Sequence, residues 1–104
     1  MHHAIGSAFH RKSRRHLQAE AQRLFNEAKD SIRCADWQQA RNLLQRASAC
    51  DPDRYEIAYR WAQAVRQTSN DAATAQVVNQ ILQQSIWTES EQAMLLQLKQ
   101  PLAN

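Results

Sequence analysis

The sequence predicts an all-α protein of about five short amphipathic helices. Glycine occurs once and proline twice in 104 residues, whereas alanine, glutamine, leucine and arginine are abundant, as helices favour. Apolar residues recur every three or four positions, and no stretch alternates with period two as a half-buried strand would. The hydrophobic pattern of the first helix pair also recurs, loosely, 34 residues later. A chain of this length is expected to form one domain at most.

The first two helices are delimited by capping residues and a proline. The first is expected from about Ser13 to Cys34. Asp36, with Gln39 three residues on, gives a capping-box pattern that opens the second helix, and Asp51-Pro52 ends it. The apolar positions expected to be buried in this pair are Leu17, Ala21, Leu24, Phe25, Ala28, Ile32, Trp37, Ala40, Leu43, Leu44 and Ala47.

Three further helices follow, separated by similar signals. Asp53 with Glu56 is a second capping-box pattern and predicts the start of the third helix. The polar run of residues 68–71 is the next break, and Thr88 with Glu91 opens the fifth helix. The expected buried positions are Ala58, Trp61, Ala62, Val65, Val77, Val78, Ile81, Leu82, Met94, Leu95, Leu98 and Leu102. Because every loop is short, neighbouring helices should pack antiparallel.

The 34-residue recurrence resembles the tetratricopeptide repeat, a helix-turn-helix unit of that length. In the first unit, Ala28, Asp36-Trp37, Ala40, Ala47 and Pro52 match the family pattern, although Ala35 replaces the usual turn glycine. The second unit is degenerate, with Asp71 at the turn aromatic and no closing proline. The resemblance implies a short right-handed superhelix over residues 13–104, with repeats at about 21–54 and 55–87 and a capping helix at about 89–99. An unrelated five-helix bundle is the alternative.

Repeats of this family bind partner segments on a concave face lined by the first helix of each pair. The resemblance carries that face onto Gln22, Phe25, Lys29 and Arg33 in the first unit, and onto Glu56, Tyr59, Gln63 and Arg66 in the second. Lys29, Arg33 and Arg66 would make the face basic and favour an acidic partner, with Phe25 and Tyr59 as aromatic anchors. The alternative for Phe25 is that it belongs to the core, and Trp87, in a linker, could be an exposed anchor.

The net charge of +3 comes from the N-terminal arm, residues 1–12, and the residues just after it. Residues 1–16 contain Arg11, Lys12, Arg14 and Arg15 and no acid, so the rest of the chain is close to neutral. These cations could bind phosphates of nucleic acid or of an anionic membrane. A nucleic-acid-associated or regulatory protein that binds through this arm is the alternative function, but no aromatic residue lies among the cations to stack on bases. A solubilising tail is the simpler interpretation. The acid-free N-terminus also fits a mitochondrial presequence, whereas the default is a cytoplasmic protein.

The sequence gives no support for catalysis, a cofactor or a metal site. All four histidines lie in residues 1–16, and there is no phosphate-binding loop and no Cys/His cluster at ligand spacing. Cys34 and Cys50 lie at the ends of successive helix segments, too far apart for a disulfide. No apolar stretch is long enough to span a bilayer.

The predicted function is therefore protein–protein interaction, as an adaptor or small chaperone that binds an extended or helical segment of another protein. The resemblance includes small bacterial secretion chaperones, which hold an aggregation-prone subunit. Two repeats give only a short groove, so a partner or a second copy of the chain could complete it.

Overall fold

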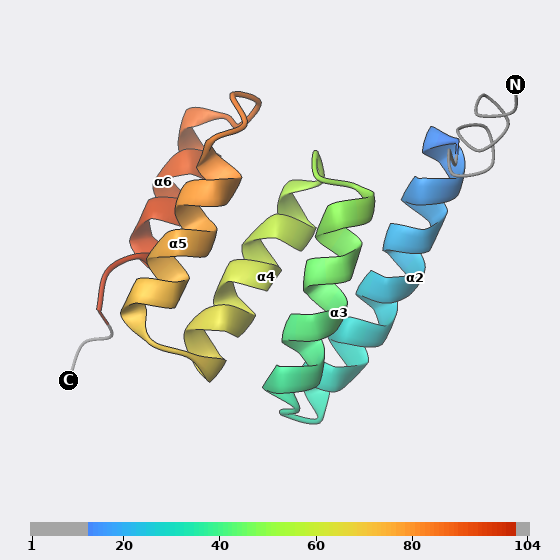
Figure 1. Ribbon diagram of the computed structural model, residues 1–104, viewed down its shortest axis with the longest axis horizontal. Coiled ribbons are helices and arrows are strands. Elements are labelled where there is room, and N and C mark those ends of the chain that lie inside the picture. Colours follow the sequence, from blue (N-terminus) through green and yellow to red (C-terminus); the bar gives the residue numbers. More distant parts are fainter. Residues whose placement is uncertain (1–12, 102–104) are drawn as a thin grey trace, which may run out of the picture.

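The computed structural model describes residues 13–101, and these residues form helices without any strand. The helices are α2 (Arg14–Arg33), α3 (Trp37–Cys50), α4 (Tyr55–Thr68), α5 (Asp71–Leu82) and α6 (Glu89–Leu98), as Figure 1 shows. The predicted all-α class is confirmed, and each predicted helix is present.

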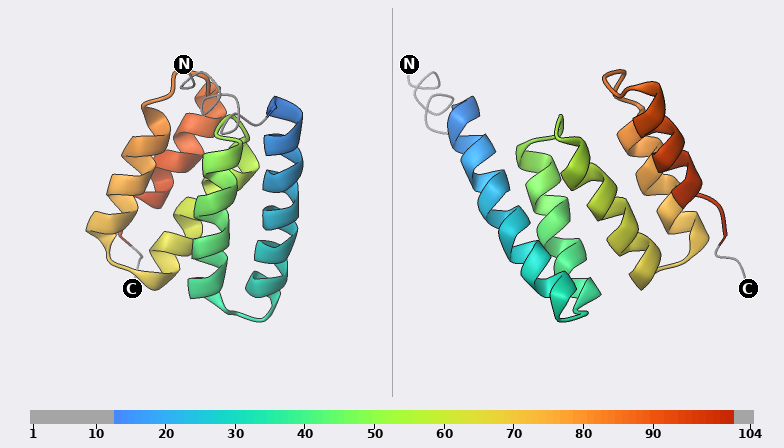
Figure 2. Two further views of the ribbon diagram at one scale, coloured as in Figure 1. Left: turned by 45° about the vertical axis from the view of Figure 1, so that its right-hand side comes forward. Right: turned by 180° about the vertical axis from the view of Figure 1, so that it is seen from behind.

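Successive helices run antiparallel, and alternate helices fall into two layers. Figures 1 and 2 show α3 and α5 on one side of the molecule and α2, α4 and α6 on the other. Two contacts fix the direction of α6 relative to α4. The rings of Tyr55 and Trp87 lie 5.8 Å apart near the start of both helices, and Arg66 Nη2 lies 3.5 Å from the carbonyl oxygen of Gln100 near their ends. Helices α4 and α6 are therefore parallel to each other.

Four helix starts are capped by a side chain, although the capping box predicted for Asp36 and Gln39 forms only through the Asp36 carboxylate. The side chains of Ser13, Asp36 and Asn70 each accept a hydrogen bond from the backbone N–H three residues on. Thr88 and Glu91 form a complete capping box, with both reciprocal hydrogen bonds present.

The capping box predicted at Asp53 is wrong. Helix α4 begins one residue later, and its N-cap is Arg54, which makes no side-chain capping bond. The Asp53 carboxylate instead accepts a hydrogen bond of 3.1 Å from Arg14 at the start of α2. A tertiary ion pair has thus replaced the local cap, which sequence spacing alone could not reveal.

The turn between α2 and α3 has an alanine, Ala35, at a position where glycine is usual. Ala35 has φ of 60°, in the left-handed region that glycine usually occupies. Its N–H donates to the Ile32 carbonyl at 2.9 Å, and the Asp36 N–H donates to the Ser31 carbonyl at 2.8 Å. These two bonds form the Schellman motif. Ala35 therefore occupies the C′ position, which glycine usually takes, although it carries a Cβ atom.

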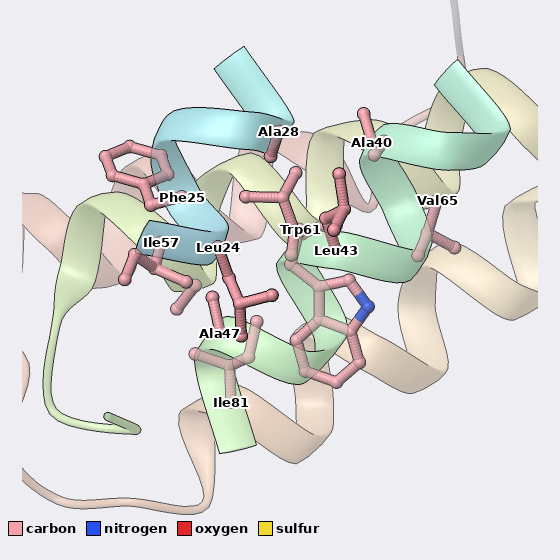
Figure 3. Close-up of a cluster of buried hydrophobic side chains, with 14 of the residues drawn as sticks. Leu24, Phe25, Ala28, Ala40, Leu43, Ala47, Ile57, Trp61, Val65 and Ile81 are labelled. Carbon is pink, nitrogen blue, oxygen red and sulfur yellow. The ribbon is translucent and has the colours of Figure 1, made fainter. Parts of the chain in front are cut away.

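One apolar core runs through all five helices, and Figure 3 shows the part of it that α2, α3, α4 and α5 form. The predicted apolar faces are largely confirmed, with Leu24, Leu44 and Leu95 at most 1% exposed. Leu17, Ile32, Trp37, Val77 and Leu82 are half-buried. Leu102 lies outside the described residues.

The prediction that Met94 faces the core is wrong, because its side chain is 46% exposed. Helix α6 packs through Leu95 and Leu98, which lie three residues apart on one stripe. Met94 lies about 100° around the helix axis from Leu95, and no described helix follows α6 to cover it.

Trp87 is a core residue and not an exposed anchor. Its side chain is 7% exposed, and its indole Nε1 donates a 2.8 Å hydrogen bond to the carbonyl oxygen of Ile81 at the end of α5. The Trp87 carbonyl in turn accepts from Gln92 at 2.9 Å. The residue therefore fastens the α5–α6 connection to the core.

Candidate functional site

The structure places the predicted binding residues on α2 and α4, but it does not expose them equally. Arg33 and Glu56 are exposed; the half-buried members are Gln22, Lys29, Tyr59, Gln63 and Arg66. Because α2 and α4 share one layer, we refer to these residues and Arg54 as the α2–α4 face.

Phe25 lies beneath this face rather than on it. Its side chain is 0% exposed, so the core alternative describes it correctly. The Lys29 ammonium lies 4.7 Å from the centre of its ring, and the Arg54 guanidinium lies 5.2 Å from it. Both distances are within the range of cation–π attraction. A partner would meet these two cations before it met the ring.

Arg54 is the residue of this face that sequence reasoning missed. Its Nη1 donates a 2.6 Å hydrogen bond to the side-chain oxygen of Gln22, which ties the start of α4 to the middle of α2. Its other terminal nitrogen lies 4.0 Å from the Glu56 carboxylate. With Asp53 as the predicted cap, Arg54 is expected to lie within the first turn of α4. No local signal identifies it, because its partner Gln22 lies 32 residues away in the sequence.

The aromatic part of the face lies where α4 meets α6. The ring of Tyr55 is 5.7 Å from that of Tyr59 and 5.8 Å from that of Trp87. The Tyr55 hydroxyl is buried and has no hydrogen-bond partner among the described residues. Burial raises the pKa of Tyr55 above its ordinary value of 10.0, with smaller contributions from Tyr59 and Glu91. Tyr59, the neighbouring aromatic residue on α4, is half-buried.

Arg66 closes the far end of the face. One terminal nitrogen contacts the Gln100 carbonyl oxygen at 3.5 Å. Its Nε is buried and has no hydrogen-bond partner in the described part of the chain. No described carboxylate forms an ion pair with Arg66, so its charge remains uncompensated there.

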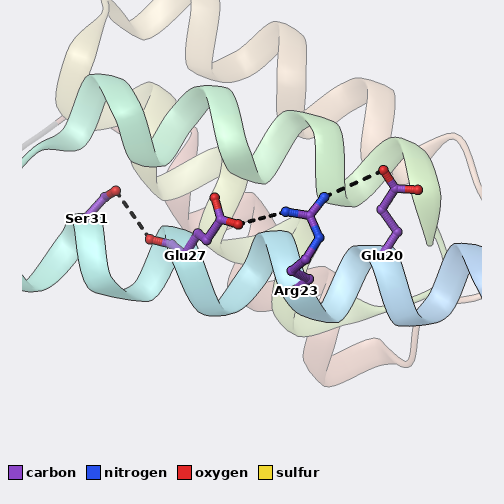
Figure 4. Close-up of polar contacts among 4 residues, drawn as sticks. All are labelled: Glu20, Arg23, Glu27 and Ser31. Atoms are coloured by element: carbon purple, nitrogen blue, oxygen red, sulfur yellow. Dashed lines mark hydrogen bonds and ion pairs between the residues drawn. The ribbon is translucent and has the colours of Figure 1, made fainter.

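The outer side of α2 is different, because its charges neutralise one another. Arg23 lies between Glu20 and Glu27, at 3.8 Å and 2.8 Å from their carboxylates (Figure 4). Arg33 likewise pairs with Asp30 on its own helix. The positive charge expected from Arg33 is therefore reduced, and the basic character of the α2–α4 face rests on Lys29, Arg54 and Arg66.

The predicted basic arm is only partly within the described residues. Arg11 and Lys12 lie outside them. Arg14 and Arg15 belong to the first turn of α2 and are exposed. Arg14 forms the ion pair with Asp53, so it contributes to the fold as well as to surface charge.

A separate hollow of about 270 Å³ lies between α3 and α5, and Trp61 of α4 is among its lining residues. Its walls are neutral, formed by Gln45, Ser48, Ala49, Pro52, Gln80, Ile81 and Gln84. Residues 13–101 contain no group of three side chains that could hold a metal ion, and Cys34 and Cys50 are free thiols. Within the same range, no helix is long and apolar enough to cross a membrane.

No family model matches the chain, and neither the curated proteins nor the solved structures contain a significant match to it.

Proposed function

We propose that this chain is a tetratricopeptide-like interaction module that binds a segment of another protein on the α2–α4 face. The observation that carries the proposal is the arrangement of alternate helices in one layer, with half-exposed polar, aromatic and cationic side chains on α2 and α4. Equivalent positions 34 residues apart, such as Lys29 and Gln63, then point the same way. The Schellman turn at Ala35 supports the repeat interpretation as well, because it supplies the geometry that the family's turn glycine provides.

In this proposal Tyr59 is the aromatic contact, and Lys29, Arg54 and Arg66 attract an acidic segment. A half-buried tyrosine offers a large, rigid contact surface and a hydroxyl at low entropic cost. Cations on a binding face mainly raise the association rate and select the partner. Phe25 contributes by supporting two of these cations from below.

The favoured specific role is a small chaperone or adaptor, of the kind that bacterial secretion systems use to hold an aggregation-prone subunit. Three large apolar side chains near α6 support it: Ile86, Met94 and Leu96 are 51%, 46% and 47% exposed. An apolar partner segment could continue from the α2–α4 face towards them. Contiguous exposed apolar patches commonly mark protein contacts, whereas single exposed apolar residues are ordinary.

The test is capture of partners from native lysate with the full chain and with a version lacking residues 1–12. The truncation stops there because Ser13 caps α2. Each is used at about 50 mM and about 200 mM salt. Tyr59→Ala is compared with Arg46→Ala, an exposed residue of α3.

The expected result is one protein retained by the truncated chain at the higher salt, lost with Tyr59→Ala and kept with Arg46→Ala. Capture of nucleic acid, or capture that disappears with residues 1–12, would contradict the proposal and favour the basic arm as the binding element. Equal loss with both alanine variants would also contradict it.

A further inference from the structure

Two cations lie over the ring of Phe25. Lys29 comes from α2 and Arg54 from the N-cap of α4, and both charges approach one fully buried ring. The two charges are therefore no further apart than about one Debye length at 0.1 M salt, about 10 Å, so they repel each other.

The counter-charges around this pair are too few to balance it. No carboxylate of the described residues forms an ion pair with Lys29, and the one beside Arg54, on Glu56, is 4.0 Å away with its side chain 56% exposed. Elsewhere on α2, Arg14, Arg23 and Arg33 each pair with a carboxylate, as Arg23 does with Glu27 at 2.8 Å. The difference is a local excess of positive charge at one point of the α2–α4 face.

The Arg54 guanidinium at this point of the face is also held in place. The Phe25 ring lies under both cations, and Gln22 accepts a 2.6 Å hydrogen bond from Arg54. A positioned guanidinium loses less side-chain freedom when it binds a carboxylate than a free one does. Its planar fork can donate two parallel hydrogen bonds to a carboxylate, while the Lys29 ammonium supplies a third.

We propose that Lys29 and Arg54 form a binding point for one aspartate or glutamate side chain of the partner segment. This inference rests on the proposed function, since it names the chemical group of the partner that the α2–α4 face would recognise. Gln22 is a positioning residue, because it acts through Arg54.

A titration followed by NMR tests the assignment directly on the full-length chain. The probe is a tetraglutamate peptide blocked at both ends, with tetraglutamine at matched ionic strength as the control ligand. The signals to follow are the Arg54 Nε–H and the Lys29 amide, with the Nε–H of exposed Arg46 on α3 as the reference for nonspecific attraction. We expect saturable shifts at Arg54 and Lys29 with tetraglutamate alone.

Two variants separate the charge from the packing. Lys29→Met keeps an apolar stem over Phe25 and should weaken peptide binding about tenfold, as loss of one charge-assisted hydrogen bond implies. Lys29→Arg should retain it. Arg54→Lys keeps the charge but removes the fork, and should weaken binding less than Arg54→Gln. Circular dichroism checks that each variant keeps its helices.

The inference is overturned if Arg46 shifts as much as Arg54, or if Lys29→Met binds tetraglutamate as well as the natural chain does. A stronger response to inorganic phosphate than to the peptide would overturn it in favour of a phosphate ligand. The two proposals can fail separately. A lysate partner that needs Tyr59 but ignores Lys29→Met would end this inference and leave the proposed function intact.

Discussion

The first three helices and the last two are built differently, although all five share one core. In α2, α3 and α4 the buried positions alternate large residues with alanines, such as Leu24 with Ala28 and Leu44 with Ala47. Contact between α2 and α3 is the most extensive in the molecule, and contact weakens steadily towards α6. The last two helices bury fewer residues and leave Ile86, Met94 and Leu96 substantially exposed.

Stability and binding capacity are therefore distributed unequally along the chain. Alanines allow close approach of helix backbones, so α3 packs closely against α2 on one side and α4 on the other. Helix α6 contacts α4 and α5 on one side only, so the apolar side chains on its other side remain exposed. Regions with few buried contacts open at lower free energy than the core does, and such regions suit a surface that must receive a partner.

The largest expected effect comes from truncating the core of the first region. Leu44→Ala should lower the free energy of unfolding by about 3 kcal/mol, because Leu44 is fully buried among rigid neighbours that cannot close the cavity. Leu95→Ala removes an equally buried side chain from α6 and should cost only about 2 kcal/mol, at the low end of the same range. Urea unfolding measures both. Equal losses would show that the two regions are equally rigid.

The next effect concerns the tryptophan that fastens α6. Trp61 and Trp87 are 8% and 7% exposed, but only the Trp87 indole N–H donates to a described residue, the Ile81 carbonyl. Trp87→Phe should therefore destabilise the chain by about 1 kcal/mol more than Trp61→Phe, the typical net value of a hydrogen bond.

Chemical denaturation of the two variants, with circular dichroism as the signal, gives the difference. A larger loss from Trp61→Phe would mean that ring packing in the first region outweighs the hydrogen bond in the second.

Sequence reasoning succeeded where a structure is decided locally. Thr88 with Glu91, and Asn70 with the N–H three residues on, could be predicted because a cap depends on a few adjacent residues. It failed at Asp53, whose partner Arg14 lies 39 residues away. It failed at Met94 because periodicity does not say where the last helix of a stack stops being covered. The contacts of Arg54 with Gln22 and Phe25 could not be predicted because, like that of Asp53, they join residues far apart in the sequence.

A smaller effect tests the turn that joins α2 to α3. A non-glycine residue in the left-handed region costs about 1 kcal/mol or more, so Ala35→Gly should raise the free energy of unfolding by up to about 1 kcal/mol. Ala75→Gly, in the interior of α5, is the matched control and should lower it by about 1 kcal/mol. Thermal unfolding distinguishes opposite signs. Destabilisation by Ala35→Gly would mean that the Ala35 methyl group contributes packing that outweighs the strain.

The smallest effect lies at the seam between the two regions, where Tyr55 of α4 meets Trp87 and Glu91 near α6. Because the Tyr55 hydroxyl is buried without a described partner, Tyr55→Phe should be neutral or stabilise by up to about 1 kcal/mol near pH 7. Burial raises the pKa of Tyr55 in the folded chain above the ordinary 10.0, so the unfolded chain releases the proton first as pH rises. This contribution to stability is complete below pH 10.0 and is lost between that value and the raised folded pKa.

Urea unfolding of the natural chain and of Tyr55→Phe, at pH 7 and at about pH 10.5, isolates this contribution. The natural chain should lose more stability than the variant over that interval, because only the natural chain carries the Tyr55 phenol. Equal losses would show that the hydroxyl reaches solvent in the folded chain. Solvent would then already enter between α4 and α6. A partner segment could therefore extend from the α2–α4 face towards Met94 and Leu96 without separating those helices.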